Sequence, residues 1–107
     1  MSEPVFYVVT AEVNPAVEAE WCGWWVRTHA PDVLAQPGFM RVTLYRADTQ
    51  PGEWSRYVAI YEVESHAALE AYFAGDAVNR LRADFQSRYG SVTRVSRQVL
   101  SPVQIVE

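Results

Sequence analysis

The sequence predicts one α/β (α+β) domain with the element order β-α-β-β-α-β, the split βαβ or ferredoxin-like arrangement. Two observations predict it. Four segments carry the two-residue alternation of β-strands, and the segments between them repeat apolar residues at the spacing of α-helices. The chain has 107 residues, which fits a single domain over residues 1–107. This order gives a four-stranded antiparallel sheet with the helices on one face.

The first strand is predicted at residues 5–13, where both alternating sets of side chains are mostly apolar. A strand of this kind is typically covered on both faces. Asn14 and Pro15 follow it and predict the start of a helix, because Asn caps free amide groups and Pro suits the first helical position.

The first helix is predicted to run to about Thr28 or His29. Its apolar face carries Trp21, Trp24 and Trp25. Pro31 biases the residue before it away from the α conformation, so we expect the helix to break there.

The remaining elements are predicted from strand alternation and from turn residues. Strands are expected at residues 39–46, 56–63 and 91–100, with a hairpin loop at 47–54 and a further short strand possible at 103–106. The second helix is expected in two pieces, which begin after Ser65 and at Asp76, since both residue types cap helices.

The sheet is predicted to be apolar on both faces, whereas helices cover only one face in this arrangement. A second copy of the sheet is the simplest cover for the other face, so we expect a homodimer. The alternative is a monomer with an unusually aromatic surface.

Composition excludes several classes of function. The net charge is −4 and no basic cluster is present, which argues against nucleic-acid binding. One cysteine excludes an internal disulfide. No apolar run approaches the roughly 20 residues that span a bilayer, and no signal-peptide pattern opens the chain. We therefore expect a cytoplasmic protein without a membrane partner.

Several stretches resemble the dimeric α/β-barrel superfamily and, within it, an uncharacterised bacterial family. The stretches are WVRTHAPDVL at 25–34, Pro37-Gly38-Phe39, Leu44-Tyr45-Arg46 and AYFAGDAVNRLRADFQSRYG at 71–90. The resemblance implies a dimeric α/β barrel. Its members include cofactor-free monooxygenases, polyketide cyclases, lactone isomerases and haem-degrading enzymes, so the fold alone does not select an activity.

His29 is the best candidate for acid–base chemistry. It ends a helix with a broad apolar face, and apolar surroundings lower the pKa of an imidazole and keep it neutral, as a general base requires. Asp32 is close enough in sequence to accept a hydrogen bond from the ring and orient it. The resemblance also implies a pocket-lining role for His29. The alternative is that His29 caps the carbonyl groups at the helix end.

Further candidates for substrate binding are Tyr7, Tyr45 and Tyr61, whose hydroxyls could hold a substrate oxygen or stabilise an oxyanion. Trp25 could form a cavity wall. Arg41 shares a strand face with Tyr45 and would bind a substrate carboxylate if that face points inward. The alternative for the tyrosines is packing at a dimer interface, and for Arg41 a contact with a partner carboxylate or with solvent.

No cofactor or metal is expected. Glu62, Glu64 and His66 are suitable metal-ligand types, but they cross a strand-to-helix turn and have no evident fourth ligand. No dinucleotide fingerprint or phosphate-binding loop is present.

These observations support a small-molecule-binding protein, and three functions remain open. The first is a cofactor-independent isomerase or cyclase that moves a proton on a small cyclic or aromatic metabolite through His29 and Asp32. The second is a non-catalytic dimeric module that binds a ligand or a partner. The third is a cofactor-free monooxygenase of phenolic substrates.

Overall fold

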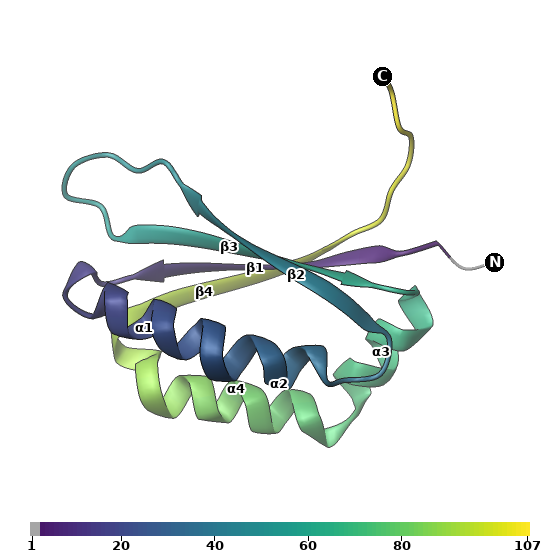
Figure 1. Ribbon diagram of the computed structural model, residues 1–107, viewed down its shortest axis with the longest axis horizontal. Coiled ribbons are helices and arrows are strands. Elements are labelled where there is room, and N and C mark those ends of the chain that lie inside the picture. The colour runs from purple at the N-terminus through teal and green to yellow at the C-terminus, as the bar shows by residue number, and fades with distance from the viewer. Residues whose placement is uncertain (1–2) are drawn as a thin grey trace.

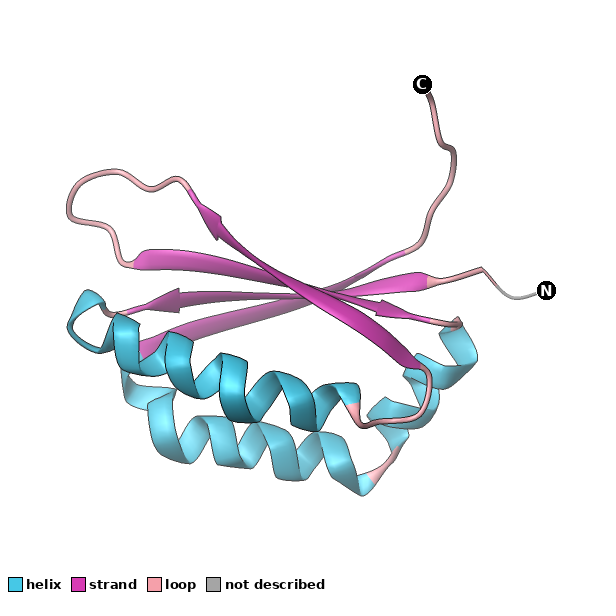
Figure 2. Ribbon diagram, in the orientation of Figure 1, coloured by secondary structure: helices cyan, strands magenta, loops and turns pink. Residues whose placement is uncertain are grey.

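The computed structural model describes residues 3–107 and confirms the predicted order of elements (Figure 1). One sheet contains β1 (Val5–Val13), β2 (Phe39–Ala47), β3 (Ser55–Val63) and β4 (Thr93–Leu100). The strands lie in the order β2-β3-β1-β4, and every neighbouring pair is antiparallel. All helices lie on one side of this sheet, which leaves the other side bare (Figure 2).

The first helical segment is longer than predicted. It runs from η1 (Pro15–Val17) through α1 (Glu18–Trp24), a π-helical turn η2 (Trp25–His29) and α2 (Ala30–Leu34). Asn14 caps it, since its Oδ1 accepts from the amide of Ala16 at 3.0 Å. The break expected before Pro31 was wrong. Proline is tolerated in the first turn of α2, and the wide π turn precedes it without interrupting the helical path.

The second helical segment has the two predicted pieces, α3 (His66–Ala74) and α4 (Asp76–Tyr89), followed by a short turn η3 (Gly90–Val92). Ser65 caps α3, because its Oγ accepts from the amide of Ala68 at 3.1 Å. Gly75 is extended and separates the pieces.

The main core lies between the helices and the sheet face that carries the odd-numbered residues of β1. Trp21 and Tyr61 are 1% and 2% exposed there. The same core contains Val5, Tyr7, Ala11, Val13, Trp24, Trp25, Phe39, Leu69, Tyr72, Leu81 and Phe85.

The opposite face of the sheet, called here the open face, carries no helix. The strand register places an apolar centre on it, formed by Phe6, Val8, Tyr45, Val58, Ile60 and Leu100, with the polar side chains of Thr10, Thr43, Ser96 and Gln98 among them. Charged residues flank this centre, among them Glu12, Arg41, Arg56, Glu62 and Arg94. The apolar character predicted for this face is therefore present on β1 and β3, whereas β4 contributes mainly polar and charged side chains to it.

Residues 101–107 extend away from the sheet without secondary structure (Figure 1). The further strand considered at 103–106 is absent from the described chain, since nothing lies beside this segment to pair with it. Val103 and Val106 are 96% and 86% exposed. Among residues 3–107, the helices are too short or too polar to cross a membrane.

Candidate functional site

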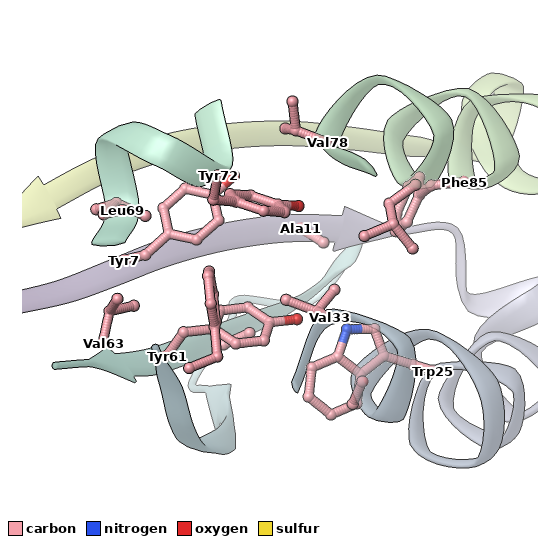
Figure 3. Close-up of a cluster of buried hydrophobic side chains, with 14 of the residues drawn as sticks. Tyr7, Ala11, Trp25, Val33, Tyr61, Val63, Leu69, Tyr72, Val78 and Phe85 are labelled. Atoms are coloured by element: carbon pink, nitrogen blue, oxygen red, sulfur yellow. The ribbon is translucent and has the colours of Figure 1, made fainter. Parts of the chain in front are cut away.

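A narrow cavity lies between the helices and the sheet, and its wall is mostly aromatic. The centre of a water molecule can move through about 40 Å³ of it. Figure 3 shows side chains from both layers that converge on this interior. The lining residues are Tyr7, Val9, Ala11, Trp21, Trp25, His29, Val33, Leu44, Tyr57, Ala59, Tyr61, Tyr72, Leu81, Arg82, Phe85, Val95 and Arg97.

Three buried tyrosines stand together at one end of this cavity. Tyr7 of β1 stacks on Tyr61 of β3 with ring centroids 5.8 Å apart, and Tyr72 of α3 lies 6.4 Å from Tyr7. Burial raises the pKa of Tyr61, and it raises the pKa of Tyr72 to about 12. These two hydroxyls are therefore protonated at neutral pH and can donate hydrogen bonds to an oxygen in the cavity.

His29 supplies the titratable group of the cavity wall. Its imidazole stacks on Trp24 with ring centroids 5.0 Å apart and meets the edge of Phe85 at 5.6 Å. Burial lowers the pKa of His29 to about 4. The ring is neutral at pH 7 and is therefore free to accept a proton.

Three charges act on His29 besides burial. The carboxylates of Asp32 and Asp84 raise its pKa, and the guanidinium of Arg97 lowers it further. Burial has a larger effect than any of the three. A change in any of these charges would alter the strength of His29 as a base.

The π-helical turn sets the direction of His29. The amide of Ala30 donates to the carbonyl of Trp25, five residues earlier, so this turn holds one more residue than an α-helical turn. Trp25 and His29, at the two ends of the turn, both line the cavity. π-Helical turns are common at functional sites.

Asp32 does not hold His29 in the expected way. No hydrogen bond joins the two side chains within residues 3–107, and Asp32 is exposed on the outer side of α2. It acts on the imidazole through its charge alone. The physical reason is that the helix continues through Pro31, which carries Asp32 around to solvent.

Arg41 and Tyr45 lie outside the cavity, on the open face. Arg41 pairs with Glu62 in the strand register, and its Nε lies 2.8 Å from the Glu62 Oε2. A β-bulge between Phe39 and Arg41 is the cause, because one extra residue reverses which side chains face the helices. Phe39 therefore points into the core, while Arg41 and Tyr45 point away from it.

The structure thus brings Tyr7, Trp25, His29 and Tyr61 to one cavity and places Asp32, Arg41 and Tyr45 elsewhere. Sequence reasoning missed Tyr72, Arg82 and Arg97 as lining residues. A signal existed for Arg97, which occupies an otherwise apolar alternation with Val95 and Val99 in β4. For Arg82, on the polar surface of a long helix, the sequence offers no comparable signal.

A carboxylate network holds the hydroxyl of Tyr57, one of the residues that line the cavity. Glu18 accepts hydrogen bonds from the hydroxyls of Tyr57 and Ser55, and Arg46 lies 3.4 Å from it. These partners, the tyrosine first, lower the pKa of Glu18. The network fixes Tyr57 against the cavity wall. Within residues 3–107, no cluster of three or more His, Cys, Asp or Glu side chains is arranged to hold a metal ion.

Comparisons with known proteins agree with this architecture. A family model described as "Domain of unknown function (DUF4286)" matches residues 4–103. No curated protein matches the chain.

Solved structures of the same fold include proteins of several descriptions. A mutant of SnoaB from Streptomyces nogalater, a cofactor-independent oxygenase, is 23% identical with a TM-score of 0.73, and the match covers 98% of each chain. An EthD family protein from Bacillus halodurans is 14% identical with a TM-score of 0.70, over 92% of this chain and 99% of that one. A candidate antibiotic biosynthesis monooxygenase from Deinococcus radiodurans is 14% identical with a TM-score of 0.69, over 96% of each chain. At these identities the likeness is one of fold.

Proposed function

Because the chain belongs to the DUF4286 family and has the fold of the dimeric α+β barrels, we propose that it is a cofactor-independent oxygenase of small electron-rich phenols. The observation that carries this proposal is a neutral, half-buried imidazole, His29, on the wall of a cavity that also presents tyrosine hydroxyls. The description of one structural neighbour as a cofactor-independent oxygenase supports it as an analogy of fold.

The chemistry begins with proton transfer. His29 accepts the proton of the substrate hydroxyl, and the resulting phenolate spreads its charge to the para carbon. Tyr61 and Tyr72 donate hydrogen bonds to the phenolate oxygen and stabilise it in a site of low dielectric constant. Asp32 and Asp84 stabilise the imidazolium through their charges.

Dioxygen is the oxidant and the second substrate. It takes one electron from the phenolate, and the radical pair forms a carbon–oxygen bond at the para carbon. The imidazolium returns its proton to the peroxide, which gives a hydroperoxide on a carbon that still bears hydrogen. Loss of water breaks the O–O bond and that C–H bond and leaves a carbonyl group. The balance is one phenol plus O₂ to one quinone plus water.

The test is oxygen uptake with 1,5-dihydroxynaphthalene, which would give 5-hydroxy-1,4-naphthoquinone and water. The wild type should consume oxygen and form quinone in equal amounts. His29→Gln should lower the rate about 100-fold or more, because it removes the base and nearly preserves side-chain size. His66→Gln is the matched control, since His66 is exposed and does not line the cavity.

Other outcomes separate the alternative functions. Conversion of a lactone or cyclic ketone in oxygen-free buffer, lost in His29→Gln, would support an isomerase or cyclase, which shares the first proton transfer. Saturable binding without turnover would support a non-catalytic module. Full turnover by a folded His29→Gln protein would overturn the acid–base role of His29 in every version.

A further inference from the structure

The cavity continues into a wider groove between α4 and β4. Four residues line both spaces: Arg82 and Phe85 of α4, and Val95 and Arg97 of β4. In the groove, the centre of a water molecule can move through about 410 Å³, roughly ten times the space inside. A ligand with more than one ring would therefore extend from the cavity into the groove, past the four residues that line both spaces.

Both arginines are exposed at this mouth and have no carboxylate partner. Five of the nine arginines form ion pairs with Asp or Glu, but within residues 3–107 neither Arg82 nor Arg97 does so. Arg82 is held in place from inside, since one of its terminal nitrogens donates to the Tyr7 hydroxyl at 3.2 Å and its guanidinium lies over the Phe73 ring at 5.8 Å. The groove therefore presents two unneutralised cations beside an apolar opening.

The positive charge reaches the interior. Arg82, Arg97 and, to a smaller extent, Arg80 oppose the effect of burial on the pKa of Tyr72, and Arg97 alone of the three acts against protonation of His29. An anion at the mouth would cancel these effects. It would make His29 a stronger base when a substrate is bound than when the cavity is empty.

Two buried indole N–H groups in the described chain have no hydrogen-bond acceptor, those of Trp21 and Trp24. Of the two, Trp21 lines the cavity, and it is 1% exposed. A buried donor without an acceptor costs about 1–3 kcal/mol of stability. A ligand with an oxygen atom at its inner end would supply the missing acceptor.

We propose that the ligand is an aromatic acid, with a phenolic or quinonoid oxygen in the cavity and a carboxylate held between Arg82 and Arg97 at the mouth. The carboxylate geometry suits guanidinium groups, which donate two parallel hydrogen bonds. The identity of the inner end rests on the proposed function, whereas recognition of the carboxylate requires binding alone.

The experiment compares two ligands of nearly the same size and shape, the anion 6-hydroxy-2-naphthoate and the neutral 6-hydroxy-2-naphthamide. Dissociation constants are measured by naphthol fluorescence or calorimetry in oxygen-free buffer, so that no turnover intervenes. The wild type should bind the acid about tenfold or more tightly than the amide, which corresponds to about 1.4 kcal/mol. The preference should shrink as salt concentration rises.

Three variants test whether Arg82 and Arg97 bind the carboxylate. Arg97→Gln and Arg82→Gln should each reduce the preference for the acid several-fold, and the double variant should abolish it. Arg80→Gln is the matched control, because Arg80 lies on the same helix but lines neither the cavity nor the groove. It should leave the preference unchanged. Melting temperatures of all variants verify that they fold.

Equal affinity of the wild type for acid and amide would overturn the inference, as would a preference that survives in the double variant or a lack of saturable binding of the acid. Its failure is distinguishable from that of the proposed oxygenase. A preference for the acid without oxygen uptake would support the arginine site and contradict the oxygenase. Oxygen uptake without a preference for the acid would support the oxygenase and contradict the arginine site.

Discussion

At the scale of single residues, His29 is the proposed base, and its lowered pKa also makes the folded chain less stable at acidic pH. The folded chain holds the imidazole at a pKa of about 4, compared with an ordinary value of 6.5. Burial among Trp24 and Phe85 opposes the charged form more than Asp32 and Asp84 favour it. The same surroundings that keep the base neutral also make it weak, and a bound anion that offsets the charge of Arg97 would strengthen it.

This shift predicts how stability depends on pH. Because the folded pKa is depressed, the unfolded chain binds the proton more tightly between pH 6.5 and 4. The contribution of His29 is therefore complete above about pH 6.5 and is lost as pH falls toward 4, by on the order of 3 kcal/mol.

His29→Gln cannot titrate and should lose less stability over this range than the wild type. Urea unfolding at a series of pH values measures the difference. His66→Gln should keep the wild-type slope. An identical slope in His29→Gln and the wild type would contradict the assignment.

Two glycines have a positive φ but different surroundings, so a comparison of them distinguishes the cost of backbone strain from the cost of a steric clash. Gly38 has φ +86° and Gly52 has φ +89°. A Cβ on Gly38 would lie 2.5 Å from the Cβ of Ala68 in α3, whereas nothing lies within 4 Å of a Cβ on Gly52. Both alanine variants bear the strain of a left-handed backbone, and only Gly38→Ala also displaces a helix.

We predict that Gly52→Ala costs about 1 kcal/mol and that Gly38→Ala costs about 2 kcal/mol more. The measurement is the free energy of unfolding in urea with m-values compared. Equal losses in the two variants would show that α3 adjusts without cost.

At the scale of elements, two local irregularities position the site. The π-helical turn at Trp25–His29 brings His29 to the cavity, and the β-bulge after Phe39 sends Arg41 and Tyr45 to the open face. Each adds one residue to a regular repeat and so shifts the phase of the residues after it. Patterns with periods of 3.6 and 2 do not reveal such insertions, which is why the sequence grouped Tyr45 and Arg41 with Tyr7 and Tyr61.

The start of α3 offers a test of how an element is held. Ser65 accepts the amide hydrogen of Ala68, and α3 supplies Tyr72 to the cavity. Ser65→Ala should cost about 1 kcal/mol in unfolding free energy, as other helix caps do. Ser101→Ala serves as a control, since it removes only an exposed hydrogen bond to His66 and should cost less than half as much. A loss as large for Ser101→Ala would argue against a capping role.

At the scale of the whole molecule, the open face is a surface of the sheet that no helix of the same chain covers (Figure 2). Its apolar centre includes Val58 and Ile60, and charged residues surround it. The fold family is typically dimeric. We propose that a second copy of this chain covers the open face, with the exposed apolar residues of 101–107 close to the same interface (Figure 1).

Ile60→Arg should convert a dimer into a monomer of about 12 kDa in sedimentation, since a desolvated arginine at the centre of a paired sheet is costly. Val26→Arg is the matched control. Val26 is 59% exposed on the helical side, so the same change there should leave the dimer intact. A wild-type chain that sediments as a monomer at micromolar concentration would overturn the proposed dimer.

The sequence by itself determined the order of elements, the single antiparallel sheet and the tryptophan face of the first helix, because strand and helix periodicity and cap residues act locally. It also selected His29, Tyr7, Trp25 and Tyr61, whose surroundings are set by those patterns. Only the tertiary structure decided which residues share the cavity. The bulge, the π turn and the approach of α4 to β4 depend on packing between distant segments. As a result, Arg41, Tyr45 and Asp32 lie outside the cavity, and Tyr72, Arg82 and Arg97, which the sequence did not predict, line it.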